Sequence, residues 1–147
     1  MLTDYVLGLG GLVFGVSLLR ASSRESKSSL LWPIGFFCGA AAAIIGGTFH
    51  GFKTYQSAST HTALWNVTML LIGASAGFMV SAAFTGPLKR NSENTRWLRA
   101  GLLLSAVGLV IQLGGISFNP NFNHNDLYHC LQTVAFYFFF RGARLTL

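Results

Sequence analysis

The sequence predicts an all-α polytopic membrane protein, a bundle of five transmembrane helices that forms one domain over residues 1–147. Hydrophobic residues make up 52% of the chain and charged residues only 10%, whereas about a quarter of a soluble domain is charged. Five apolar runs each approach the ~20 residues that a helix needs to span a bilayer. The basic residues fall in short clusters between these runs, which favours a membrane surface over nucleic acid as their partner.

The first run, about 3–20, has Asp4 near its start and Arg20 at its end. It lacks the basic first segment and the small-residue cleavage site of a signal peptide, so we expect a retained first helix. The other runs cover about 31–51, 62–84, 97–118 and 124–143. The connections between them are short, so we expect no soluble domain.

The basic residues predict the orientation. Nine of them fall on one side of the predicted bundle and Lys53 alone on the other. By the positive-inside rule the N-terminus lies outside and the C-terminus in the cytoplasm of a cell (inner) membrane. The nine are Arg20, Arg24, Lys27, Lys89, Arg90, Arg96, Arg99, Arg141 and Arg144. Trp32 and Trp97 then fall at the inner interface and Trp65 at the outer one, as an interfacial aromatic belt.

The same orientation places every histidine on the outer side. Small residues recur at helical spacing along four runs, and such stripes face other helices. The stripes are Asp4-Gly8-Gly11-Gly15, Gly39-Ala43-Gly46-His50, Asn66-Gly73-Gly77-Ser81 and Gly101-Ser105-Gly108-Gln112-Gly115. On the fifth run Asp126, His129 and Thr133 share a face that Phe136 and Phe140 continue inward. We expect a convergence of polar groups in the outer third of the bundle, formed by Asp4, His50, Asn66, Gln112, Asp126 and His129.

Each of these polar groups also has a purely structural interpretation. Asp4, His61 and His124 fit solvated caps and loops, and Asp126 fits a first-turn acid that the helix dipole favours. Gln112 and Asn66 fit hydrogen bonds between helices. An ionisable group inside a membrane is nevertheless a candidate functional residue, and His50 and His129 are the strongest of these.

Two kinds of cofactor suit the histidines. A catalytic zinc ion takes three protein ligands and leaves a position open for water; His50 and His129 would supply two, and His124 or His61 the third. Asp126 or Asp4 would orient a ligand or act as general base on the acidified water. Alternatively, haem b would be held between His50 and His129. A third hypothesis is a small accessory or anchor subunit of a larger membrane complex, or a homo-oligomer.

The segment FNHNDLYHCLQTVAFYFFFRGARL from Phe122, with TDYVLG from Thr3 and GGTFHGF from Gly46, resembles a family of uncharacterised multi-pass bacterial membrane proteins. TFHGFKTYQ is distantly similar to a second-helix motif of the alkaline ceramidases and their relatives, membrane hydrolases with an intramembrane zinc. That resemblance implies a lipid-like substrate, His50 as a zinc ligand and His129 as part of the C-terminal histidine pair.

Overall fold

A computed structural model of the protein describes residues 2–22, 27–86, 92–119 and 122–147, with the side chain of Lys27 left out. Arg24, Lys89 and Arg90, which entered the prediction of orientation, lie outside this part. The elements are α1 (Leu2–Ala21), α2 (Lys27–Gly51), the short 3₁₀ helix η1 (Lys53–Tyr55), α3 (Ala58–Thr85), α4 (Glu93–Gly114) and α5 (His124–Arg144). The all-α prediction is confirmed.

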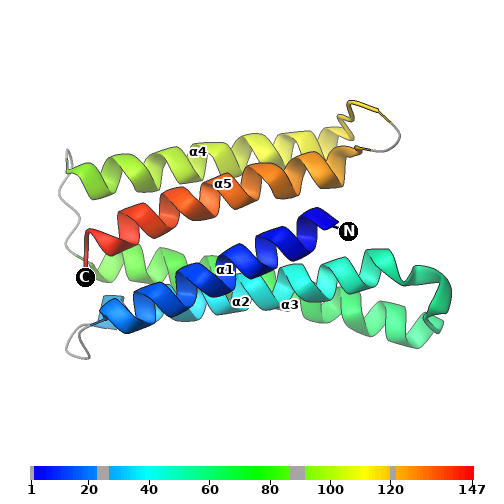
Figure 1. The fold of residues 1–147 in the computed structure, drawn as a ribbon, viewed down its shortest axis with the longest axis horizontal. Coiled ribbons are helices and arrows are strands. Elements are labelled where there is room, and N and C mark those ends of the chain that lie inside the picture. The colour runs from blue at the N-terminus through cyan, green and yellow to red at the C-terminus, as the bar shows by residue number, and fades with distance from the viewer. Residues whose placement is uncertain (1, 23–26, 87–91, 120–121) are drawn as a thin grey trace.

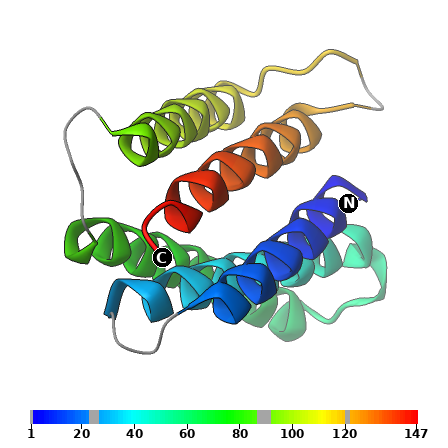
Figure 2. The same ribbon diagram turned by 60° about the vertical axis from the view of Figure 1, so that its left-hand side comes forward.

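The helices form a row in the spatial order α4, α5, α1, α2, α3, and each packs on its neighbours in that row. Figures 1 and 2 show the row curving, with α5 and α1 in its middle. The N-terminus, η1 and the start of α5 lie at one end, here called the histidine end, with His50, His61, His124 and His129. The C-terminus lies at the other, the arginine end, with Arg20, Arg96, Arg99, Arg141 and Arg144.

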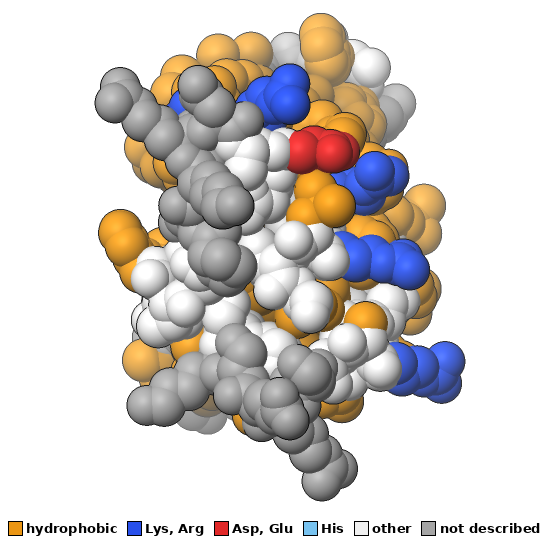
Figure 3. All heavy atoms as spheres, turned by 90° about the vertical axis from the view of Figure 1, so that its left-hand side faces the viewer, with side chains coloured by type: hydrophobic (Ala, Val, Ile, Leu, Met, Phe, Trp, Pro, Cys, Tyr) orange, Lys and Arg blue, Asp and Glu red, His pale blue; other side chains and the backbone are white. Residues whose placement is uncertain are grey.

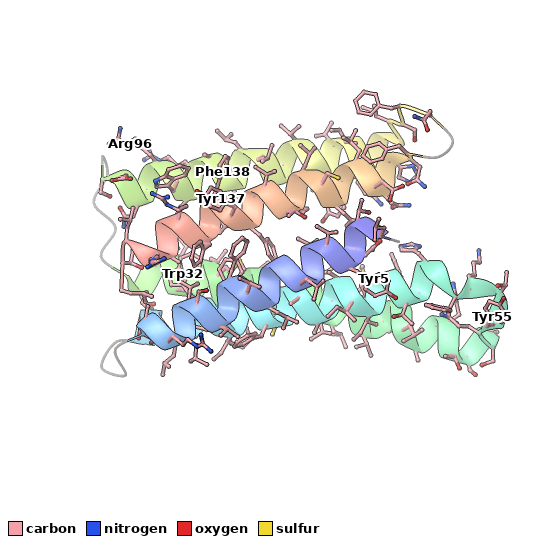
Figure 4. The ribbon with its side chains drawn as sticks, in the orientation of Figure 1. Tyr5, Trp32, Tyr55, Arg96, Tyr137 and Phe138 are labelled. Atoms are coloured by element: carbon pink, nitrogen blue, oxygen red, sulfur yellow. The ribbon has the colours of Figure 1, made fainter. Side chains whose placement is uncertain are left out.

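A cluster of buried hydrophobic residues lies toward the arginine end. It consists of Leu18, Trp32, Phe36, Met79, Ala82 and Ala143. Aromatic side chains of α5 complete it, since the ring of Phe140 stacks on Phe14 at 4.8 Å and that of Phe136 meets Phe36 edge-on at 5.3 Å. The phenylalanines of α5 thus fill the space between helices. Trp32 lies toward the arginine end (Figure 4), but it is only 1% exposed, so its ring fills this core and does not face lipid as in the predicted interfacial belt.

In three of the four predicted stripes, glycine allows neighbouring helices to pack closely. A Cβ added to Gly8 would lie 2.7 Å from Ile44, and one added to Gly39 would lie 2.6 Å from the ring of Phe136. On α4, a Cβ at Gly101 would lie 2.8 Å from the ring of Phe139. These stripes on α1, α2 and α4 therefore face other helices, as predicted.

The predicted stripe on α3 is wrong. Asn66, Gly73, Gly77 and Ser81 lie on its exposed side, and a Cβ at Gly73 or Gly77 would meet nothing within 4 Å. The buried face of α3 instead carries Thr68, Ser75, Met79 and Ala82. α3 carries small residues on all of its faces, so small size alone does not select the face that packs on α2. A specific contact selects it: the hydroxyl of Ser75 donates to the carbonyl of Gly35 at 2.8 Å.

Four helix boundaries differ from the prediction by four residues: the starts of α2, α3 and α4 and the end of α4. The structure gives a local reason for two of them. α2 begins at Lys27 although Pro33 lies inside it. A proline has no N–H for the carbonyl four residues earlier, and here the hydroxyl of Ser22 donates to that carbonyl, on Ser29, at 3.1 Å. α4 ends at Gly114 because Gly115 adopts φ +62°, a left-handed helix cap that favours glycine.

Four helices are long and apolar enough to cross a membrane: α1, residues Ser28–Gly51 of α2, α3 and α4. Their outward faces are apolar, with Leu70 73%, Phe84 83% and Leu113 79% exposed. Such extensive exposed apolar surface is typical of a protein whose solvent is lipid. The helices thus support a multi-pass membrane protein.

The arginine end carries basic side chains along one edge (Figure 3). The guanidinium of Arg141 lies 5.1 Å from the ring centre of Trp97 and donates to the hydroxyl of Tyr137 at 3.4 Å. Tyr137 and Phe138 lie together at this end of α5 (Figure 4). A cation stacked on aromatic rings at a helix end is a common arrangement at membrane interfaces.

Candidate functional site

The start of α5 is held by a capping box. The side chain of Asn123 accepts from the N–H groups of Asn125 (2.9 Å) and Asp126 (3.3 Å), and the carboxylate of Asp126 accepts from the N–H of Asn123 at 3.4 Å. Such reciprocal bonds satisfy N–H groups that a helix start leaves without partners. The polar segment at the start of α5 is therefore rigidly oriented, and Asp126 has the structural role of a first-turn acid.

A carboxylate–histidine pair lies between α1 and α5. Oδ1 of Asp4 and Nε2 of His129 are 3.4 Å apart, and the side chains are 2% and 13% exposed, respectively. The glycines of α2 make room for the acid, since a Cβ at Gly47 would lie 2.9 Å from Cβ of Asp4. Burying a carboxylate is costly unless it is paired, and His129 supplies the pairing here.

Two further side-chain contacts fix the N-terminal turn of α1. The hydroxyl of Thr3 donates to Asp126 of α5 at 2.8 Å, and the hydroxyls of Tyr5 and Thr48 lie 3.3 Å apart, joining α1 to α2. Asp4 lies between these contacts. Its position relative to His129 is therefore set from both neighbouring helices.

A pocket of about 470 Å³ opens beside this pair, between the end of α2, the start of α3 and the start of α5. We call it the histidine pocket, and it is lined by Phe49, His50, His61, Thr62, Trp65, His124 and Asn125. The pocket is shallow and wide open to the exterior, so a molecule bound there would be covered on one side only.

The ring of Phe49 organises one wall of the histidine pocket. Its centre lies 4.0 Å from that of His61, 4.8 Å from His50 and 5.2 Å from Trp65. Trp65 remains 44% exposed and His50 is exposed as well, so this wall presents both aromatic and imidazole side chains to the exterior. Asn125 lines the pocket, and the next residue, Asp126, accepts from Thr3 of α1, so the pocket lies near the pair along the start of α5.

The predicted convergence is therefore formed in part. The structure joins Asp4 to His129, with Asp126 beside them, and it places His50 in the adjoining pocket. Gln112 bonds to Asn125 at 2.6 Å, while Asn66 lies on the exposed face of α3. Sequence reasoning missed the pocket wall, although the i, i+4 spacing of His61 and Trp65 places them on one helix face.

Some buried polar atoms at the histidine end have no hydrogen-bond partner among the described residues: Nδ1 of His129, Nε2 of His61, and Oε1 of Gln56 and Gln112. Buried polar groups in proteins are nearly always hydrogen-bonded. Because such exceptions gather at functional sites, these atoms single out the histidine end as the place to look for a bound polar molecule.

A metal site is not assembled here. Over the described ranges, no three His, Cys, Asp or Glu side chains form a group that could hold a metal ion. His50 and His124 line the pocket, whereas Nε2 of His129 faces Asp4. Zinc on His50, His124 and His129, and haem b between His50 and His129, stay predictions without a supporting contact.

Comparison with known proteins places the chain in a family. The sequence profile of the "Family of unknown function (DUF6962)" matches two overlapping stretches, residues 1–91 and 83–147, which together cover the whole chain. The chain belongs to this family. No curated protein and no solved structure matches it. The expected membership of an uncharacterised family is thus confirmed, and for this family the function has to be argued from the site.

Proposed function

We propose that the protein is a multi-pass protein of the cell (inner) membrane that hydrolyses a lipid-like substrate at its histidine end, on the outer side. The observation that carries this proposal is the pair of Asp4 and His129, joined at 3.4 Å and nearly closed to solvent. A carboxylate that orients an imidazole is the usual arrangement of a general base. Ionisable groups at membrane depth are also rare without a function.

All five helices span the membrane in this proposal, with the N-terminus outside. α5 has 21 residues, which at 1.5 Å per residue extend about 31 Å, enough to cross the hydrocarbon. Its polar groups are largely turned toward α1 and α4, as in the pairing of Gln132 with Ser105 at 3.1 Å. The basic residues of the arginine end support its cytoplasmic location.

The reaction uses a water molecule as nucleophile. Nδ1 of His129 is buried and has no partner among the described residues, so in this proposal the helix ends must part to admit water and substrate. Nδ1 then takes a proton from the water as the water oxygen attacks the carbonyl carbon of an ester or amide. The carboxylate of Asp4 stabilises the imidazolium through Nε2. His129 then returns the proton to the leaving alcohol or amine as the carbon–heteroatom bond breaks, which releases a fatty acid. Asp126 acts as a positioning residue, since it holds α1 through Thr3.

The proposal is tested with the purified protein in detergent and two probes, p-nitrophenyl dodecanoate and N-dodecanoyl-p-nitroaniline. We expect turnover of at least one probe and a loss of about 100-fold or more in His129→Gln, the usual contribution of a general base. Cys130→Ala is the control, because Cys130 follows His129 in the chain and its side chain is exposed. Absence of turnover, or full activity of His129→Gln, contradicts the proposal.

Elemental analysis of the same preparation separates this mechanism from the zinc hydrolase that the distant ceramidase resemblance implies. The acid–base mechanism predicts turnover that persists in EDTA. Stoichiometric zinc that disappears in His50→Ala and His129→Ala would establish the zinc mechanism in its place. A Soret band in the absorption spectrum would establish haem b.

A second candidate function, an accessory subunit of a larger membrane complex, is favoured by the exposed face of α3. Gly73 and Gly77 have nothing within 4 Å of an added Cβ, and small residues on a membrane-facing side allow another helix to approach closely. This candidate predicts that the protein co-purifies in fixed stoichiometry with a membrane partner and shows no turnover of either probe.

The orientation is tested with reporters fused to the C-terminus. We expect a fluorescent reporter that matures only in the cytoplasm to be active there, and alkaline phosphatase to be inactive, because the basic residues keep the arginine end inside. A phosphatase fused in the η1 region, after Tyr55, is expected to be active and serves as the control. The reverse pattern would overturn the orientation.

A further inference from the structure

We propose that the histidine pocket is a binding site for the anionic head group of a single-chain lipid. Three imidazoles line it, from His50, His61 and His124, and its lining contains no carboxylate. An imidazole is either neutral or positively charged, so the lining itself adds no negative charge. The neighbouring carboxylates of Asp4 and Asp126 are outside the lining, where they contact His129 and Thr3. The inference rests on the proposed function in one respect: the fatty acid released by that reaction is itself a single-chain lipid with an anionic head group.

The hydrogen-bonding groups around the pocket are suited to an oxyanion. The amide oxygen of Asn125 already accepts from Gln112 at 2.6 Å, which leaves the amide NH₂ of Asn125 to donate. Nε2 of His61 has no partner among the described residues. Carboxylates and phosphates only accept hydrogen bonds at neutral pH, so donor-rich walls favour them over alcohols or amines.

The apolar side of the pocket indicates that the ligand carries a hydrocarbon chain. Trp65 lines the pocket and is 44% exposed, and α3 continues from it with the exposed side chains of Met69 and Ile72. A chain that leaves the head group can lie along this apolar surface of α3 within the bilayer. A small soluble anion would leave the aromatic wall unused.

The test uses the fluorescence of Trp65 in purified protein, with brominated dodecanoate, brominated dodecyl phosphate and brominated dodecanol as probes. We expect the anionic probes to quench at concentrations about tenfold or more below the alcohol, and the stronger of the two anions identifies the head group. The other tryptophans, Trp32 and Trp97, lie toward the arginine end, so quenching should disappear in Trp65→Phe. Equal binding of the alcohol, or quenching that persists in Trp65→Phe, overturns the proposal.

Variants then locate the head group. His61→Gln and His124→Gln are each expected to weaken anion binding several-fold. Tyr55→Ala is the control, because this side chain is 86% exposed at the tip of η1 and lies outside the pocket lining (Figure 4). Unchanged anion binding in both histidine variants would contradict the site. His129→Gln should bind the anion normally while losing turnover, so failure of the hydrolase proposal and failure of the binding site give different results.

Discussion

Replacing His129 by leucine is expected to destabilise the protein by about 3–5 kcal/mol, because it takes the imidazole away from the buried carboxylate of Asp4. Asp4 is 2% exposed, so water can replace little of the interaction with His129. Asp4→Leu should cost less, since the imidazole that remains can be neutral and uncharged groups are cheaper to bury. Thermal unfolding of the purified variants in detergent measures both effects.

The double variant provides the control for this prediction. In Asp4→Leu/His129→Leu no buried carboxylate remains, so stability should return to near that of Asp4→Leu alone. Such non-additivity is the signature of a direct interaction between two groups. Strictly additive losses would show that the two side chains contribute independently and that the pair is not coupled.

Replacing Gly39, in the middle of α2, by leucine is expected to destabilise the protein by a similar amount. A Cβ at this position would lie 2.6 Å from the ring of Phe136 and 2.9 Å from the hydroxyl of Ser75. Three helices, α2, α3 and α5, meet there, so no single neighbour can move away alone. Overpacking a close-packed interior typically costs about 1–3 kcal/mol, and contact on several sides places Gly39→Leu at or above the upper limit.

Gly77→Leu is the matched control for Gly39→Leu. Both residues are helical glycines, but a Cβ at Gly77 would meet nothing within 4 Å, so the leucine should leave thermal stability in detergent unchanged or slightly raised. Leucine has a higher helix propensity than glycine in both variants, so the difference in stability between them reports packing alone. If Gly77→Leu were as destabilising as Gly39→Leu, α3 would have to pack by its opposite face.

The polar site was predictable in part because helical periodicity carries some of its geometry. Asp4 heads a stripe of glycines on α1, and that spacing was enough to turn the acid inward. His129 lies one turn after Asp126 and shares its face, so its direction was also predictable. The pairing of Asp4 with His129 was not predictable, because this contact joins two helices that are separated by most of the chain.

The predictions for the face of α3 and for the ring of Trp32 failed because local sequence does not show which side of a helix meets its neighbours. Residues 73–77 read GASAG, so small side chains occur on every face, and periodicity alone cannot choose among them. The hydroxyl of Ser75 decides the choice by reaching the carbonyl of Gly35. Trp32 was assigned to the interface by residue type, yet its ring is needed to fill the core between α1, α2 and α3.

The sequence by itself determined the class of protein, the number and approximate extent of the helices, and the separation of histidines from most basic residues. These follow from local composition, because each helix must be apolar along its own length before it meets any other. Only the tertiary structure decided that Asp4 pairs with His129 and that His50, His61 and His124 surround one pocket. Those contacts depend on which helix faces meet, and that choice is made by side-chain fit between distant parts of the chain.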